Sequence, residues 1–357
     1  MTSQAFGRIL ANFAKRGSFI RGFQMLHRSV PADMTPHENW VTAQIKAAGA
    51  DAARVVPAIA SYGQLLDRLA PLSEQHHAYG VLVFPKSPAL LAEGARIARR
   101  KNAPLIGGIA QVIRDETMRA VVSFERARMG RVEVYGEQRA CAVIRASLDP
   151  SHPLDAHKGV RWENCWPSYV GRDESVQVAE KWHTRVGIVP ARAIQPIELG
   201  PLWLAPLLTG VEPDIGDDEI APAPTIRTVM VRMDFVEASK ARSAAKKDAT
   251  QDQAKQIYEQ RKGMVTDGSS EVAISESARR REDLKAGSGH HGVIYSAAVS
   301  VTGRDEDDAL RACTRVEQAA GECGIDEIEW QDHRHDVGMF LTLPLGRGLA
   351  GTKFTRH

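Results

Sequence analysis

Residues 292–330 have the sequence GVIYSAAVSVTGRDEDDALRACTRVEQAAGECGIDEIEW, and they indicate the class of the fold. Residues 292–302 are rich in β-branched and small apolar side chains, which is typical of a buried strand. The acidic run Asp305–Asp308 favours the start of a helix, and Gly321 or Gly324 offers its end. A short strand over 325–330 would complete a strand-helix-strand unit.

A second strand, IRTVMVRMDFV over 226–236, precedes this unit, and a polar stretch over about 239–286 separates the two. Ala, Lys, Arg, Glu and Gln dominate the polar stretch, which predicts an arm of one or two exposed helices. After residue 330, the run VGMFLTLPL (337–345) predicts a final strand. This order favours a helix-covered mixed or antiparallel sheet with a split β-α-β arrangement of ferredoxin-like type.

The first half of the chain alternates between strand-like and helix-like segments. Strands are predicted at 18–28, 76–84 and 131–136, and helices at about 38–70, from 88 onward, at 106–127 and at 137–148. The N-terminus forms an amphipathic helix in this interpretation, with Phe6, Ile9, Leu10 and Phe13 on one face. The break DPSHP (149–153) predicts a boundary between two α+β domains, 1–150 and 151–357, each with its own sheet.

Composition excludes some classes of protein. With 43% hydrophobic and 25% charged residues in 357, the chain is typical of a soluble globular protein, and its net charge of +2 implies no polyanionic partner. Its four cysteines form no C-x-x-C pair, so we expect a reducing cytoplasm. The apolar stretch IELGPLWLAPLLTGV (197–211) is too short to span a bilayer, which takes about 20 residues.

No catalytic, cofactor or metal site is predicted. Gly346, Gly348 and Gly351 have the spacing of a dinucleotide-binding loop, but the six residues after Gly351 leave no room for the helix and strand that such a loop needs. No phosphate-binding loop with a lysine occurs either. The run DHRHD (332–336) could bind a metal ion, but an exposed turn is the preferred interpretation because no distant ligand accompanies it.

The polar arm carries the residues that the sequence offers as an interaction surface. These are Lys246, Lys247, Tyr258, Arg279, Arg280 and Arg281. Acidic residues are interleaved with them, and aromatic side chains other than Tyr258 are missing from the arm. The pattern favours a solvated helical arm that docks onto protein and binds nucleic acid weakly and without sequence preference at most.

Several segments, in this order, carry a resemblance to a known family. They are AFGRILANFAKRGSFIRGFQML, WPSYVGRDESVQVAEKWHTRVG, GPLWLAPLL, IRTVMVRMDFVEASKARSAAKKDAT, GVIYSAAVSVTGRDEDDALRACTRVEQAAGECGID and DVGMFLTLPLGRGL. Together they resemble a family of membrane-associated proteins from actinobacterial conjugative transfer systems, which belong to the type IV secretion class. That family is similar to the N-terminal, non-motor half of conjugative secretion ATPases, and the resemblance covers nearly the whole chain.

The resemblance implies a non-catalytic assembly component at the cytoplasmic face of a conjugation apparatus. Its expected partners are a secretion ATPase, other apparatus proteins or a second copy of itself. Family members carry membrane helices before this core, so membrane association here would come only from partners or from a missing N-terminal segment. Two alternatives stay open: a component of a type VII secretion apparatus, and a nucleic-acid-binding module that uses the basic arm.

Overall fold

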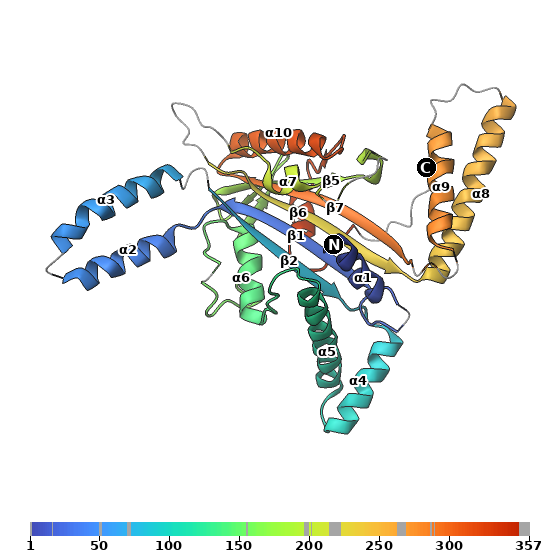
Figure 1. Cartoon of the computed structure of the whole chain (residues 1–357), viewed down its shortest axis with the longest axis horizontal. Helices are drawn as coiled ribbons and strands as arrows, with labels where there is room; N and C mark the ends of the chain where they lie inside the picture. The colour runs from blue at the N-terminus through green and yellow to red at the C-terminus, as the bar shows by residue number, and fades with distance from the viewer. Residues whose placement is uncertain are drawn as a thin grey trace. The chain divides into compact units, whose positions relative to one another are not determined.

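The computed structural model describes residues 2–15, 17–49, 52–69, 73–154, 156–195, 200, 202–213, 223–262, 269–285, 288 and 290–349. Within these residues, eight strands form one sheet in the order β2-β1-β6-β7-β5-β4-β3, and β8 also pairs with β5 (Figure 1). The sheet is antiparallel and helices connect its strands, so the predicted α+β class is confirmed. The sequence indicated two sheets, whereas β1 from the first half pairs with β6 from the second, which joins the strands into one sheet.

The strands are β1 Gly22–Pro31, β2 Glu74–Val83, β3 Tyr169–Gly171, β4 Val176–Val178, β5 Trp182–Val189, β6 Ile226–Val236, β7 Gly292–Gly303 and β8 Glu329–Trp330. The α-helices are α1 Thr2–Phe13, α2 Thr35–Ala48, α3 Ala52–Leu69, α4 Pro88–Lys101, α5 Leu105–Arg126, α6 Glu137–Leu148, α7 Ala205–Thr209, α8 Ala238–Lys262, α9 Ser269–Asp283, α10 Glu306–Glu322 and α11 His335–Gly338. The 3-10 helices are η3 Ala191–Ala193 and η4 Met339–Thr342. No helix in the described ranges is both long and apolar enough to cross a membrane.

Contacts between residues divide the chain into two compact units. Unit 1 comprises Met1–Gln24, Leu82–Val134 and Arg232–Tyr295, and unit 2 comprises Met25–Val81, Tyr135–Val231 and Ser296–His357. Both units include segments from either side of residue 150, because the long strands β1, β2, β6 and β7 each have residues in both. This division by contacts does not test the predicted domain ranges, so 1–150 and 151–357 stay a prediction.

Aromatic side chains form the core of unit 1. Phe23 of β1 stacks on Phe124 of α5 with 5.8 Å between ring centroids, and Phe13 of α1 lies 6.0 Å from Phe235 of β6. The apolar face predicted for the N-terminal helix packs into this cluster, where Phe13 is buried. Burial of this face is what holds α1 in place, since apolar area removed from water contributes about 25 cal/mol per Å².

A split β-α-β arrangement organises unit 2. Strand β5 pairs antiparallel with β7, from His183↔Gly303 to Val189↔Ala297, and also antiparallel with β8. β7 and β8 are therefore parallel to each other with β5 between them, and α10 connects them as the strand-helix-strand order predicted. The apolar face of α10, which includes Cys313 and Val316, packs into the same buried cluster as Val299 and Val301 of β7.

Three pairs of consecutive helices follow strands of the sheet, and each pair packs together: α2 with α3 in unit 2, and α4 with α5 and α8 with α9 in unit 1 (Figure 1). The α4–α5 pair is close because two glycines meet, and a Cβ on Gly108 would lie 2.0 Å from the carbonyl oxygen of Gly94. Helices α8 and α9 confirm that the predicted arm is helical, and residues 263–268 between them lie outside the described residues.

Two predicted strands are wrong. Residues 337–342 form the end of α11 and the 3-10 helix η4, and residues 343–345 are irregular. His335, Gly338, Met339 and Thr342 are buried at a spacing of three to four residues, where a strand would bury every second one. Residues 131–136 contain no strand; they pass from α5 to α6 with mostly exposed side chains.

Candidate interaction surface

The helical arm places the predicted interaction residues on two helices. Lys246, Lys247 and Tyr258 lie on α8 and Arg279, Arg280 and Arg281 on α9, and all six side chains are exposed. Arg280 Nη1 lies 3.1 Å from Asp248 Oδ2, next to Lys247, so the two basic clusters are brought close together. The same contact pairs one arginine with a carboxylate, which removes part of the positive charge that a phosphate backbone would need.

Tyr258 lies apart from the basic clusters of the arm. It is eleven residues beyond Lys247 on one helix, which is roughly 16 Å at the usual rise per residue. The ammonium of Lys262 lies 4.6 Å from the centroid of its ring. The structure therefore brings the lysine and arginine clusters together, whereas Tyr258 lies at a distance from both clusters.

Only the foot of the arm is anchored by apolar packing among the described side chains. Ala241 and Ala245 of α8 pack with Leu284 and with Val236 at the end of β6. Farther along, α8 has no continuous apolar face, because alanine and polar residues make up most of its sequence. The arm is thus a solvated element whose charges of both signs alternate.

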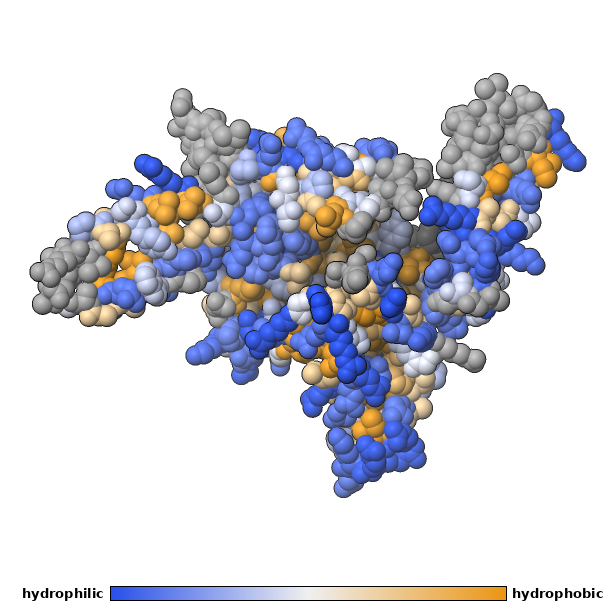
Figure 2. Space-filling view, viewed as in Figure 1, coloured by the Kyte–Doolittle hydropathy of each residue, from blue (hydrophilic) through white to orange (hydrophobic). Residues whose placement is uncertain are grey.

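The α2–α3 pair carries an exposed apolar surface that the sequence did not single out. Trp40 is 58% exposed, and Ile45, Leu65 and Leu69 are also exposed. Figure 2 shows hydrophobic residues at the surface of the α2–α3 pair, on the left of the view. The ring of Tyr62 on α3 lies edge-on to Trp40 at 6.5 Å, so the indole is oriented by the neighbouring helix. We name Trp40, Ile45, Leu65 and Leu69 the apolar surface of α2–α3. A tryptophan within a helix otherwise rich in polar residues is the signal that could have indicated it.

A buried ion pair holds β2 and β6 of unit 2 to the segment around α7. Arg227 donates from both terminal nitrogens to the carboxylate of Glu74, at 2.7 and 3.1 Å, and also to the carbonyl oxygens of Leu207 and Leu208. Arg227 is almost completely buried, and its donors are directed to protein acceptors. The guanidinium of Arg227 therefore has a structural role, because its N–H groups all donate to protein acceptors and none is left to bind a ligand.

Two histidines lie beside this ion pair. His27 Nε2 lies 3.3 Å from His76 Nδ1, and the hydroxyl of Ser29 lies 3.0 Å from the same His76 nitrogen. Burial lowers the pKa of His27 below its ordinary value, and His76 and Arg227 lower it further. Among the side chains that the structure describes, no three His, Cys, Asp or Glu residues are grouped as a metal site would require.

The DHRHD run is divided between two environments. His333 has a positive φ of 63° and lies exposed, 3.3 Å from Asp173. His335 is buried, accepts a hydrogen bond on Nδ1 from the Val186 N–H at 2.9 Å, and has its Nε2 3.2 Å from Asp332 Oδ1. Burial lowers the pKa of His335, although the Asp332 carboxylate opposes this shift. The two imidazoles therefore lie in separate environments and have separate partners.

The glycine triplet offers no phosphate cradle among the described residues. Gly346 adopts a positive φ of 65° directly after Leu345, and Gly348 follows in irregular backbone without a helix. Gly351 lies outside the described residues. A dinucleotide loop acts through a helix N-terminus that binds the pyrophosphate, and residues 343–349 contain no helix that could supply one.

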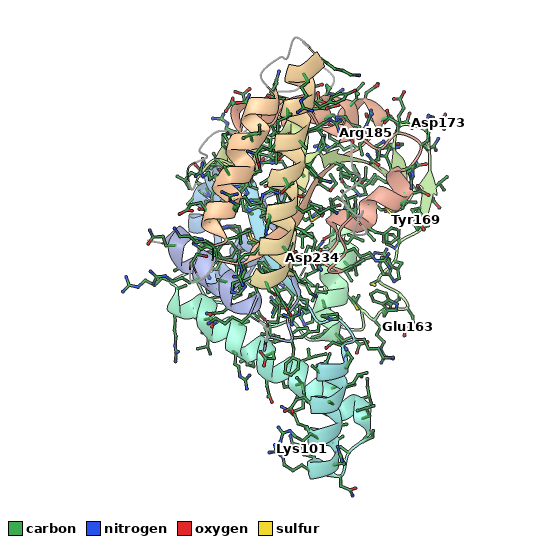
Figure 3. All side chains as sticks on the ribbon, turned by 90° about the vertical axis from the view of Figure 1, so that its right-hand side faces the viewer. Lys101, Glu163, Tyr169, Asp173, Arg185 and Asp234 are labelled. Atoms are coloured by element: carbon green, nitrogen blue, oxygen red, sulfur yellow. The ribbon has the colours of Figure 1, made fainter. Side chains whose placement is uncertain are left out.

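Comparison with family models found no match, and no curated protein matches the chain either. A functional assignment must therefore rest on the surfaces described above and on the order of the segments in the sequence. The apolar surface of α2–α3 is one such surface among the described residues. The α4–α5 pair offers a basic one, because residues 86–131 contain ten Lys and Arg against four Asp and Glu; Lys101 lies at the far end of α4 (Figure 3).

Proposed function

We propose that this chain is a non-catalytic assembly component of a conjugative, type IV secretion apparatus, and that it docks onto the secretion ATPase of that apparatus. The observation that carries the proposal is the apolar surface of α2–α3, where four large side chains are exposed. Tryptophan is enriched among the residues that dominate the affinity of protein interfaces, whereas solvated helices rarely expose it in company with leucines.

Two further observations support a protein partner. The basic residues of the arm are interleaved with acids, and Arg280 is paired with Asp248, so the arm offers no continuous track for a phosphate backbone. The sequence segments also resemble, in their order, a membrane-associated family of conjugative transfer that is similar to the non-motor half of conjugative ATPases. In this proposal the chain supplies docking surfaces at the cytoplasmic face of the membrane, and the ATPase supplies the motor.

Binding of the purified chain to the motor ATPase of the same transfer system tests the proposal. We expect Trp40→Ala to weaken binding by about 30-fold, which corresponds to roughly 2 kcal/mol for a buried interface tryptophan. Interferometry with the immobilised ATPase measures both affinities directly.

Leu202→Ala is the matched control, because Leu202 is also large, apolar and exposed but lies outside the helix pairs. We expect it to bind the ATPase within about twofold of the unchanged chain, since scattered exposed apolar residues are ordinary on protein surfaces. Failure of the unchanged chain to bind the ATPase, or equal affinity of the Trp40→Ala variant, would rule out docking through α2–α3.

A further inference from the structure

Charge is divided very unequally between the two units. Unit 1 has 26 Lys and Arg against 15 Asp and Glu, a net charge of +11. Unit 2 has 20 Lys and Arg against 29 Asp and Glu, a net charge of −9, and the two values add up to the +2 of the whole chain. A near-neutral protein therefore consists of two strongly and oppositely charged units. The positive surface of one molecule attracts the negative surface of another molecule across solvent.

The negative charge of unit 2 is concentrated in residues 305–336, which we name the acidic segment. It contains eleven Asp and Glu against three Arg, a net charge of −8, over α10, β8 and the start of α11. Part of this charge is paired within unit 2, as Asp332 is with Arg185. Asp307 and Glu322 are exposed on α10, and between them Leu310 is 49% exposed. The outer side of α10 thus combines carboxylates with an apolar centre.

The positive charge of unit 1 includes a matching surface on α4–α5, which we name the basic hairpin. Residues 86–131 contain ten Lys and Arg against four Asp and Glu, a net charge of +6. Arg96 is paired with Glu93, but Arg100 and Arg114 are exposed without such a carboxylate among the ion pairs described. At the start of α5, Ile106 is 73% exposed, so this surface also has an apolar component.

From this complementarity we infer that the chain assembles head to tail, with the basic hairpin of one copy bound to the acidic segment of the next. The inference rests on the proposed function, because it names a second copy as one partner of the assembly component. Two different surfaces meet in such a contact, so repetition generates a ring or a filament. Exposed Leu310 and Ile106 favour a protein occupant over nucleic acid, since interfaces between proteins bury apolar centres within polar rims.

Sedimentation of the full chain over a range of protein and salt concentrations tests the inference. We expect association at about 50 mM NaCl that weakens at least tenfold at about 500 mM, where the Debye length falls to roughly 4 Å. Arg100→Glu with Arg114→Glu, and separately Asp307→Lys with Glu322→Lys, should each weaken association at least tenfold. An equimolar mixture of these two double variants should associate again, because each retains the surface that the other has lost.

Lys240→Glu with Arg242→Glu is the control, because these exposed residues of α8 change the charge of unit 1 by the same amount outside the basic hairpin and should leave association within about threefold. Circular dichroism melting shows whether each variant is folded, and a restored mixture also excludes misfolding. A chain that stays monomeric at low salt, or a mixture that does not associate, overturns the inference, as does DNA binding by the basic hairpin without self-association. If a monomeric chain still binds the ATPase through Trp40, head-to-tail assembly is wrong and the proposed function stands.

Discussion

Arg227 contributes to the stability of unit 2 through hydrogen bonds that only a buried guanidinium can make. Its removal leaves the Glu74 carboxylate and the Leu208 carbonyl oxygen without their donor. We expect Arg227→Met to lower the free energy of unfolding by about 3–5 kcal/mol, as for other buried ion pairs that lose one partner. Arg227→Met combined with Glu74→Leu should recover part of this loss, because no unpaired charge remains buried. Urea unfolding gives the three values, and a loss below about 1 kcal/mol for the single variant would contradict this account.

His335 makes the stability of unit 2 depend on pH. Its Nδ1 accepts the Val186 N–H, so a proton on that nitrogen breaks the bond, and burial holds the pKa of the folded state below the ordinary 6.5. As the pH falls through about 6.5, the unfolded chain gains this proton first, so stability is present above that pH and is lost below it.

We expect His335→Gln to reduce the fall in the free energy of unfolding between about pH 7.5 and pH 5.5, because glutamine does not titrate. His27, whose pKa is also lowered, accounts for some of the dependence that remains. Urea unfolding at both pH values measures the change, with exposed His333→Gln as the control that should behave like the unchanged chain. An identical pH dependence in both variants would argue against a role for His335.

Among the secondary-structure elements, the α4–α5 pair depends on glycine at one position and not at its neighbour. A Cβ on Gly108 would lie 2.0 Å from the Gly94 carbonyl oxygen, whereas a Cβ on Gly107 would meet only Ala103 at 3.9 Å. Gly108→Ala should therefore lower the free energy of unfolding by about 1–3 kcal/mol through overpacking. Gly107→Ala should raise it by about 0.5–1 kcal/mol, because alanine loses less backbone entropy in a helix. Thermal unfolding compares the two, and a shift of the same sign in both would refute the close approach of the helices.

Elements with a clear periodicity could be predicted from the sequence, and elements fixed by distant contacts could not. Strand β6 has the predicted bounds, and α10 begins one residue after its predicted start, because Asp305 caps it. The segment 339–342 is apolar and short, a pattern that fits a strand or a buried helical turn equally well. The segment adopts the helical turn because it packs against β5. The approach is so close that a Cβ on Gly338 would lie 3.3 Å from Val186 of β5.

The interaction surfaces were only partly predictable for the same physical reason. The basic clusters of the arm are consecutive in the sequence, so composition alone indicated them. The apolar surface of α2–α3 takes residues from two helices, and only the packing of these helices places Tyr62 of α3 beside Trp40 of α2.

The sequence pattern at 292–330 indicated the split β-α-β arrangement. The pairing of β1 with β6 joins strands about 200 residues apart, and local periodicity does not report such a pairing.

For the whole molecule, the division of charge shows why a net charge of +2 was uninformative. Long strands contribute residues to both units, so the +11 of unit 1 and the −9 of unit 2 are assembled from segments far apart in the chain. A docking protein with oppositely charged units can bind two partners at once, one through each unit. This arrangement suits the proposed assembly component, which would hold other proteins in a defined order.

The frequency of conjugative transfer tests the central claim most directly. In the organism that encodes this chain, deletion of the gene should abolish transfer, and the unchanged gene supplied in trans should restore it. Supplied as Trp40→Ala, the chain should give transfer at least tenfold lower, as expected from a loss of about 1.4 kcal/mol or more in docking, while Leu202→Ala should restore transfer fully. Normal transfer in the deletion strain, or full restoration by Trp40→Ala at equal protein levels, would contradict the proposal that this chain works in conjugation through the apolar surface of α2–α3.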